Sequence, residues 1–312
     1  MGKLAFLFPG QGSQAMGMLA NLAETHPKVR ETFIQASTVL GYDLWQLAQE
    51  GPKDSLNQTD RTQPAMLTAG TAIWLSWRAM GGKVPDFMAG HSLGEYTAWV
   101  CAGAFGFRAT VALVADRARY MLEAVPQNEG AMVAILGLSD EIVKNICQQA
   151  SQDQIVEAAN FNAPGQVVIA GHVSAINRAV EYACRAGAKT VTLPVSVPAH
   201  CSLMKPAAVR LNQRLSEFAI EAPIIPVVNN VDVAINSDPN TIRSALVRQL
   251  DHPVRWVETL LWLKSQGVDT MIECGPGKVL TGLTRRIEKN IVILPVYDQD
   301  SLDKALKITG EM

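Results

Sequence analysis

The residues best suited to covalent chemistry lie in a glycine-bounded stretch at positions 90–94, which reads Gly-His-Ser-Leu-Gly. It matches the pattern G-x-S-x-G, in which a serine occupies a very tight turn between a strand and a helix. Glycines two residues to either side leave room for that turn, because larger side chains would collide with the backbone. The turn would expose the Ser92 hydroxyl at a helix N-terminus, where N–H groups favour negative charge. We therefore predict that Ser92 is a nucleophile, with a helix-capping serine as the alternative.

A serine nucleophile needs a base, and five histidines are available. His200 is the strongest candidate, because it follows a stiff apolar segment with prolines at 194 and 198 that favours fixed geometry. His91 adjoins the serine, so we expect its side chain to point elsewhere. His26 and His172 are interpreted as surface residues, and His252 lies in a polar stretch. A purely structural histidine at position 200 is the alternative.

A hydrolase triad would place an acid between Ser92 and His200 in chain order. Several acids lie in that interval, among them Asp140, Asp153 and Glu157, but no neighbouring motif selects one of them. The residues therefore predict a Ser–His pair and leave its third member open.

Short apolar runs alternate with longer helix-like segments around these residues. Residues 4–8 and 86–89 are expected to be buried strands, the first followed by a Gly-rich turn and the second by the Ser92 turn. Strands separated by helices at this spacing predict a parallel sheet covered on both faces. The other expected elements are helices near 16–24, 27–40, 59–77, 95–104 and 107–123, and strands at 269–273 and 291–295.

The middle of the chain has a different pattern, in which strands and helices are short and alternate regularly. Strands are expected at 131–136, 167–170 and 189–195, with helices at 140–150 and 173–186. This β-α-β-α-β series is typical of a small ferredoxin-like unit. We therefore predict an α/β fold in which residues 1–125 and 197–312 form a parallel-sheet core and residues 126–196 an inserted subdomain.

The composition argues against several classes of protein. Hydrophobic residues make up 48% of the 312 residues, and the formal charge of -2 argues against binding nucleic acid by bulk charge. Five scattered cysteines without a C-x-x-C pair, and histidines without an H-E-x-x-H motif, give little support to a metal site. Apolar stretches stop well short of the ~20 residues that a membrane span needs. We expect a cytoplasmic protein with reduced thiols, without metal or membrane.

Five stretches occur in a fixed order along the chain: FLFPGQGSQAMG at 6–17, GHSLGEYTA at 90–98, NFNAPGQ at 160–166, PVSVPAH at 194–200 and ECGPGKVL at 273–280. Together they resemble the malonyl-CoA:acyl-carrier-protein transacylases of fatty-acid synthesis. The similarity covers nearly the whole chain. It implies an α/β-hydrolase-like core with a ferredoxin-like subdomain, and transfer of a malonyl group from CoA to the phosphopantetheine thiol of acyl carrier protein.

The resemblance also implies roles for individual residues of the reacting centre. Ser92 would carry the acyl group, and His200 would be its general base. The backbone carbonyl of Gln249, rather than a carboxylate, would orient the histidine. Backbone N–H groups of Gln11 and Leu93 would form the oxyanion hole.

Further implied roles concern the substrate. Arg117 would pair with the free carboxylate of the malonyl group through two parallel hydrogen bonds. By helical pattern alone, Arg117 or Arg119 would instead form a surface ion pair with a neighbour such as Asp116. Gln63 and Asn160 would lie on polar positions of the cleft.

The implied partner is an acidic carrier protein, so we expect a basic docking surface on this chain. Candidates are Lys278, Arg285, Arg286 and Lys289, for which a solvated helix face is the alternative. The implied reaction uses malonyl-CoA as a substrate and needs no cofactor. We expect the protein to be a monomer.

Three other functions fit parts of the sequence. A serine hydrolase would use the same Ser92 turn but release the acid to water. A dinucleotide-binding module would explain the Gly-rich turn at 10–15. Its ribose-binding acid should end a second strand some 20 residues on, but Glu31, the nearest candidate, lies in a predicted helix. A non-catalytic binding protein on this fold would have no need of Ser92 and His200 together.

Overall fold

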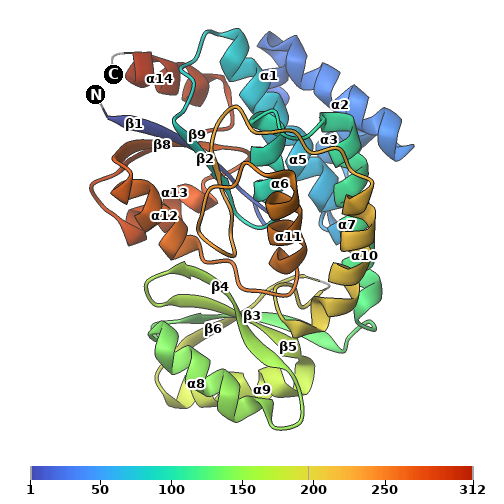
Figure 1. Ribbon diagram of the computed structural model, residues 1–312, viewed down its shortest axis with the longest axis vertical. Helices are drawn as coiled ribbons and strands as arrows, with labels where there is room; N and C mark the ends of the chain where they lie inside the picture. The colour runs from blue at the N-terminus through green and yellow to red at the C-terminus, as the bar shows by residue number, and fades with distance from the viewer. Residues whose placement is uncertain (1, 196, 311–312) are drawn as a thin grey trace.

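The computed structural model describes residues 2–195 and 197–310, and two sheets organise them (Figure 1). The larger sheet is parallel, with the strand order β7-β2-β1-β8-β9. Because the strands run in one direction, the segments that follow β1, β2 and β7 emerge at the same edge of the sheet. The bounds are β7 Val227–Val228, β2 Phe87–Gly90, β1 Lys3–Phe8, β8 Val268–Cys274 and β9 Val292–Val296.

Helices cover both faces of this sheet. In β1, Leu4, Phe6 and Phe8 join one buried cluster, whereas Ala5 and Leu7 join another on the opposite face. This explains why the strand is a continuous apolar run rather than an alternating one. The helices on the second face are α12 Trp256–Ser265 and α13 Val279–Ile287. The main helices of the first cluster are α2 Pro27–Leu40, α5 Thr59–Ala79, α6 Leu93–Cys101, α7 Phe107–Ala124, α10 Lys205–Ser216, α11 Pro239–Gln249 and α14 Gln299–Gly310.

The second sheet is antiparallel and lies below the first in Figure 1. Its chain order is β-α-β-β-α-β and its strand order is β4-β5-β3-β6, which is the ferredoxin-like arrangement. The predicted fold class, a parallel α/β-hydrolase-like core with an inserted ferredoxin-like subdomain, is therefore confirmed. The elements are β3 Gly130–Leu136, α8 Asp140–Ser151, β4 Val156–Ala163, β5 Gln166–His172, α9 Val173–Arg185 and β6 Lys189–Thr192.

The structure corrects the predicted β-α-β-α-β series of the insert, which lacked β4. That strand places half-buried polar residues, Glu157 and Asn162, among buried ones, and its pairing with β5 is interrupted by register shifts. It therefore has no clean two-residue periodicity. In the core, β7 was missed because two residues carry no pattern, and α6 begins directly after Ser92 rather than at residue 95.

The predicted domain limits remain a prediction. The strands of the small sheet run from Gly130 to Thr192, within the range 126–196. Ser196, the last residue of that range, lies outside the described residues.

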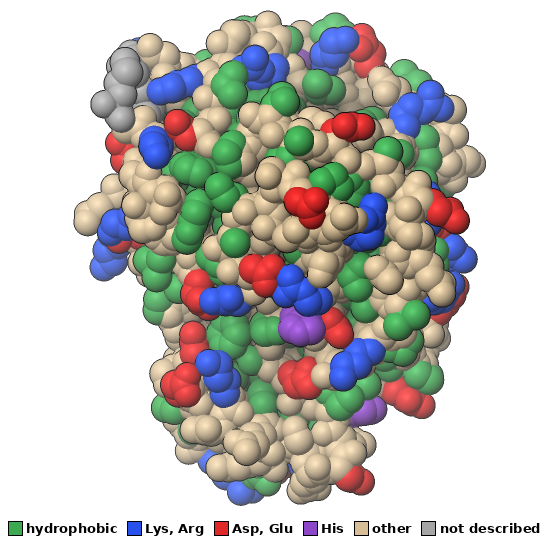
Figure 2. Space-filling view, in the orientation of Figure 1, with side chains coloured by type: hydrophobic (Ala, Val, Ile, Leu, Met, Phe, Trp, Pro, Cys, Tyr) green, Lys and Arg blue, Asp and Glu red, His purple; other side chains and the backbone are tan. Residues whose placement is uncertain are grey.

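Charged side chains of both signs are interspersed over the face drawn in Figure 2. Charged side chains of opposite sign also form ion pairs in the described chain, such as Arg248 with Asp232. Among residues 2–195 and 197–310, no helix combines the length and the apolar character that a membrane span requires.

Candidate active site

Ser92 lies on a strained turn that joins β2 to α6. Its backbone has φ 52° and ψ -110°, a conformation that non-glycine residues rarely adopt and that concentrates at functional sites. The two glycines of the motif make the turn possible. A Cβ on Gly90 would lie 1.9 Å from the carbonyl carbon of Gly94, and a Cβ on Gly94 would lie 2.0 Å from the carbonyl oxygen of Phe8. The glycine spacing is thus a packing requirement of the turn.

The structure brings Ser92 and His200 into contact. The Ser92 hydroxyl lies 2.7 Å from Nε2 of His200, within hydrogen-bond distance for proton transfer. On the other side of the ring, Nδ1–H donates to the backbone carbonyl of Gln249 at 2.7 Å. A carbonyl oxygen can only accept, so this bond leaves Nε2 free to accept the serine proton. The oxygen beside Nδ1 therefore comes from the main chain and not from an acid.

His200 is held as a neutral base. It is 3% exposed, and its backbone adopts φ 64° at the end of the proline-containing segment. Burial is the main cause that lowers the pKa of His200 to about 3, with the charge of Arg117 acting in the same direction. Because this pKa lies far below neutrality, the imidazole is neutral at pH 7 and Nε2 keeps its lone pair.

Arg117 of α7 is 1% exposed and points at the reacting pair. Its Nη2 lies 3.4 Å from the Ser92 hydroxyl and 3.0 Å from the side-chain oxygen of Gln249, and its Nη1 donates to the side-chain oxygen of Gln63 at 2.8 Å. All three acceptors are neutral, and within the described chain Nε of Arg117 has no partner. The Tyr96 ring lies 5.2 Å from the guanidinium carbon. A buried cation held only by neutral groups is prepared to bind an anion.

The predicted oxyanion donors lie at the same sheet edge. Gln11 follows β1, Leu93 is the first residue of α6, and a Cβ on Gly10 would lie 3.7 Å from the backbone nitrogen of Leu93. In the part of the chain that is described, neither the Gln11 nor the Leu93 N–H donates to a protein oxygen. Gln11 and Leu93 line the same cavity as Ser92, so their role as oxyanion donors stays a prediction.

A cavity of about 260 Å³ connects these groups. Seven predicted residues line it, whereas Gln249 lies behind it. Asn160 reaches the cavity from β4 of the small sheet and is 6% exposed. Apolar side chains of Met121, Met132 and Val168 complete the wall. The seven lining residues are Gln11, Gln63, Ser92, Leu93, Arg117, Asn160 and His200.

Two residues of the site were not identified from the sequence. Asn230, in the loop after β7, accepts from the Ser92 N–H at 2.7 Å and donates to the Gly90 carbonyl at 2.7 Å. Glu95, on the first turn of α6, is 1% exposed and accepts from the Asn230 N–H and from the side-chain nitrogen of Gln249. The sequence did hold a signal for Glu95, which is an acid within the largely apolar segment 93–101. Acids are seldom buried without a partner, so an acid in such a segment points to a specific role.

None of the other four histidines hydrogen-bonds to Ser92, although His91 lines the cavity. His91 bonds to Asn162 at 2.8 Å, away from the serine hydroxyl. The interpretation of His26 as a surface residue is wrong: it is 8% exposed, lies directly before α2, and bonds to Gln299 of α14. His172 is half-buried and accepts from a backbone N–H. Over the described residues, no three His, Cys, Asp or Glu side chains are placed to hold a metal ion.

Known proteins are similar to this chain over nearly its full length. Residues 5–309 match the family described as acyl transferase domain. A malonyl CoA-acyl carrier protein transacylase of Salmonella typhimurium is 52% identical over 307 residues, which cover 98% of this chain and 99% of the relative. The corresponding Bacillus subtilis protein is 41% identical over 313 residues, which cover 100% and 98%.

Two solved structures are similarly close. An acyl carrier protein S-malonyltransferase from Vibrio cholerae has a TM-score of 0.95 at 54% identity, covering 97% of this chain and 99% of that one. A malonyl-transacylase in complex with a type II polyketide acyl carrier protein has a TM-score of 0.97 at 52% identity, covering 98% and 99%.

Proposed function

Because the chain belongs to the acyl transferase domain family, we propose that it transfers a malonyl group from CoA to the phosphopantetheine thiol of acyl carrier protein. The product would supply fatty-acid or polyketide elongation. The observation that carries the proposal is the buried guanidinium of Arg117, which has only neutral partners and lies 3.4 Å from the Ser92 hydroxyl. A nucleophile beside such a cation suits an acyl group that ends in a carboxylate.

In the first half of the reaction, the Ser92 oxygen attacks the thioester carbon of malonyl-CoA while its proton passes to Nε2 of His200. The negative charge that develops on the thioester oxygen is stabilised by the N–H groups of Gln11 and Leu93. The carbon–sulfur bond then breaks, and the CoA thiolate takes the proton from His200. Malonyl-Ser92 and free CoA are the products of this half.

In the second half, the same groups act in the reverse order. The phosphopantetheine thiol gives its proton to His200 and attacks the ester carbon of malonyl-Ser92. The carbon–oxygen bond breaks, the Ser92 oxygen recovers the proton, and the malonyl thioester of the carrier protein leaves. Both thiols are substrates, so the reaction as proposed needs no cofactor.

Arg117 would select the malonyl group by two effects. Its guanidinium can bind the carboxylate through two hydrogen bonds, which an acetyl group lacks. An acetyl group would also leave the buried cation without an anionic partner. Gln63 and Gln249 hold the guanidinium from two sides and would limit the directions from which the carboxylate can approach.

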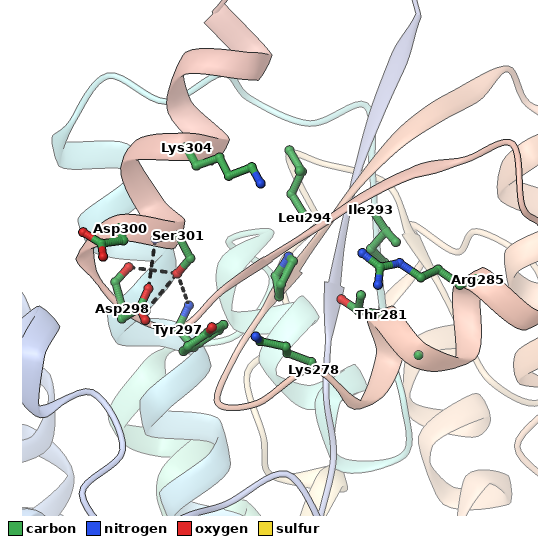
Figure 3. A pocket seen from close by; sticks show the side chains of 12 residues that line it. Lys278, Thr281, Arg285, Ile293, Leu294, Tyr297, Asp298, Asp300, Ser301 and Lys304 are labelled. Atoms are coloured by element: carbon green, nitrogen blue, oxygen red, sulfur yellow. Dashed lines mark hydrogen bonds between the residues drawn. The ribbon is translucent and has the colours of Figure 1, made fainter.

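For the carrier protein, the hollow between α13 and α14 refines the predicted docking surface. Three basic residues, Lys278, Arg285 and Lys304, line this hollow, as do two acidic ones, Asp298 and Asp300. The ends of Arg285 and Lys304 turn toward the hollow from opposite sides (Figure 3). The opposite side of α13 contributes Leu280 and Leu283 to the wall of the active-site cavity. A carrier protein bound to this helix would therefore lie next to the cavity that its thiol must enter.

Arg286 fits this surface less well than the sequence indicated. Its guanidinium bonds to the side chain of Gln166 and to the carbonyl of Pro164, in the turn between β4 and β5. Reversing Arg285 and Lys304 to Glu should raise KM for the carrier protein and leave KM for malonyl-CoA unchanged, with Lys28→Glu on α2 as the matched control. An equal rise in both constants, or no rise, would remove the docking proposal.

Release of CoA with and without holo carrier protein tests the proposed reaction. A transferase should release about one equivalent of CoA in a burst without carrier protein and turn over continuously when carrier protein is added. Continuous release without carrier protein would identify a thioester hydrolase instead.

A further inference from the structure

Glu95 is a fully buried carboxylate to which the proposed mechanism gives no role. It lies on the first turn of α6, three residues after Ser92, and is 1% exposed. Its hydrogen-bond donors are all neutral: the Asn230 N–H at 2.9 Å, Nε2 of Gln249 at 2.8 Å and Nε1 of Trp99 at 3.3 Å. A buried acid without a cation at hydrogen-bond distance is costly, so its presence calls for a functional reason.

The two nearer hydrogen-bond partners of Glu95, Asn230 and Gln249, also form hydrogen bonds with groups at the reacting centre. Asn230 accepts from the Ser92 N–H at 2.7 Å. Gln249 accepts from the Nδ1–H of His200 through its main-chain carbonyl and from Arg117 through its side-chain oxygen, at 2.7 and 3.0 Å. Glu95 itself touches none of these three groups, yet each is held by one of its two partners.

The direction of the Gln249 amide explains why an acid is suited to this position. An amide side chain can rotate by 180° and exchange its oxygen and nitrogen. A carboxylate can only accept, so Glu95 fixes the nitrogen of Gln249 toward itself and the oxygen toward Arg117. A carboxylate, an amide and a guanidinium thus form one chain of two hydrogen bonds, and the negative charge at one end offsets the positive charge at the other.

We propose that Glu95 is a positioning residue that acts through Gln249 to hold Arg117 buried, charged and directed at the substrate carboxylate, and through Asn230 to hold the Ser92 turn. This inference rests on the proposed function, because it assumes that Arg117 binds the malonyl group. The sequence did not decide which acid accompanies Ser92 and His200. In the structure, Glu95 bonds to Gln249, and Gln249 bonds to His200.

Two substitutions separate the charge of Glu95 from its hydrogen bonds. Glu95→Gln keeps an oxygen for Asn230 and Gln249 but loses the charge, whereas Glu95→Met keeps the length of the side chain and loses both. Thr97→Val is the matched control, since Thr97 is equally buried on α6 and its hydroxyl has no partner among the described residues. Each variant is assayed for malonyl loading from malonyl-CoA and for labelling of Ser92 by an uncharged fluorophosphonate, which needs the Ser–His pair but not Arg117.

We expect Glu95→Gln to slow malonyl loading about threefold to tenfold, chiefly through KM, while fluorophosphonate labelling stays within about twofold of wild type. Glu95→Met should slow both reactions at least about tenfold. Thr97→Val should change neither. Malonyl loading within about twofold of wild type in both Glu95 variants, or an equal loss of both reactions in Glu95→Gln, would overturn the proposal. A wild-type protein that reacts with the fluorophosphonate but not with malonyl-CoA would instead contradict the proposed function.

Discussion

The two faces of α7 carry arginines two residues apart in opposite environments. Arg119 lies on the outer face, has a side chain 53% exposed, and pairs with Asp116 at 2.8 Å. Arg117 lies on the inner face, is 1% exposed, and contacts only neutral oxygens. Arg119 is an ordinary surface ion pair, whereas Arg117 carries a charge that the protein leaves uncompensated at hydrogen-bond distance.

The comparison shows that the surroundings, and not the residue type, decide what an arginine does. Burial lowers the pKa of Arg117, while the adjacent Asp116 carboxylate raises the pKa of Arg119. Solvent screens the outer pair, and its loss should matter little. The buried guanidinium of Arg117 is not screened by solvent, so we expect that removing it changes the rate of malonyl loading.

The largest effect should follow Arg117→Ala. Malonyl loading of Ser92 should fall about 10²–10³-fold, because the carboxylate loses its partner, while acetyl loading should stay the same or rise. Stopped-flow measurement of CoA release with both thioesters gives the two rates. An equal fall for malonyl-CoA and acetyl-CoA would mean that Arg117 supports the site but does not select the substrate.

A smaller effect should follow Gln63→Leu, which removes the oxygen that accepts from Nη1 of Arg117 at 2.8 Å. We expect malonyl loading to slow about tenfold, because a buried donor is left without its partner. The KM for malonyl-CoA should rise more than kcat falls. An unchanged KM would show that Gln249 alone is enough to hold the guanidinium.

The pH dependence of the two reactions should distinguish titration of His200 from titration of Glu95, which compensates the charge of Arg117. Burial raises the pKa of Glu95 to about 7, against hydrogen bonds and the charge of Arg117 that lower it, and the pKa of His200 is lowered to about 3. As pH falls from 7.5 to 5, Glu95 takes up a proton and Arg117 loses its compensating charge, while His200 remains neutral.

Malonyl loading should therefore decrease about threefold to tenfold over that range, and fluorophosphonate labelling of Ser92 should stay flat. Tyr96, the other titratable group beside Arg117, has its pKa raised to about 12 by burial and does not titrate there. Parallel rate measurements with both reagents test this. A matching decrease of the two rates would assign the titration to His200.

The smallest effect should follow Arg119→Ala. Loss of an exposed pair should change malonyl loading by less than about twofold and the free energy of unfolding by less than about 1 kcal/mol. Urea denaturation and the loading assay measure both. A loss of loading comparable to that of Arg117→Ala would remove the distinction between the two faces.

The sequence predicts those parts of the molecule that depend on residues close together in the chain. The tight turn requires glycine at 90 and 94, because a Cβ would lie 1.9 Å from backbone at the first position and 2.0 Å from backbone at the second. The apolar run of β1 predicts a strand buried on both faces, and the structure has one. The stiff segment before His200 ends in the predicted contact with Ser92.

Contacts between distant segments escaped prediction. Asn230 lies 138 residues after Ser92 and Gln249 lies 154 residues after Glu95, and no pattern within a single element links them. The position of Gln249 came from resemblance alone, and that resemblance concerned its carbonyl rather than its side chain. Arg117 and Arg119 share one helical pattern, so only the packed structure distinguishes the buried guanidinium from the exposed one.

The most direct test of the account is intact-protein mass spectrometry after brief mixing with malonyl-CoA, with acetyl-CoA and a Ser92→Ala variant measured alongside. We predict that wild type gains one malonyl group, that Ser92→Ala gains none, and that acetyl-CoA gives little adduct in the same time. An adduct that persists in Ser92→Ala, or equal loading by both thioesters, would contradict a malonyl-selective serine acyl-enzyme.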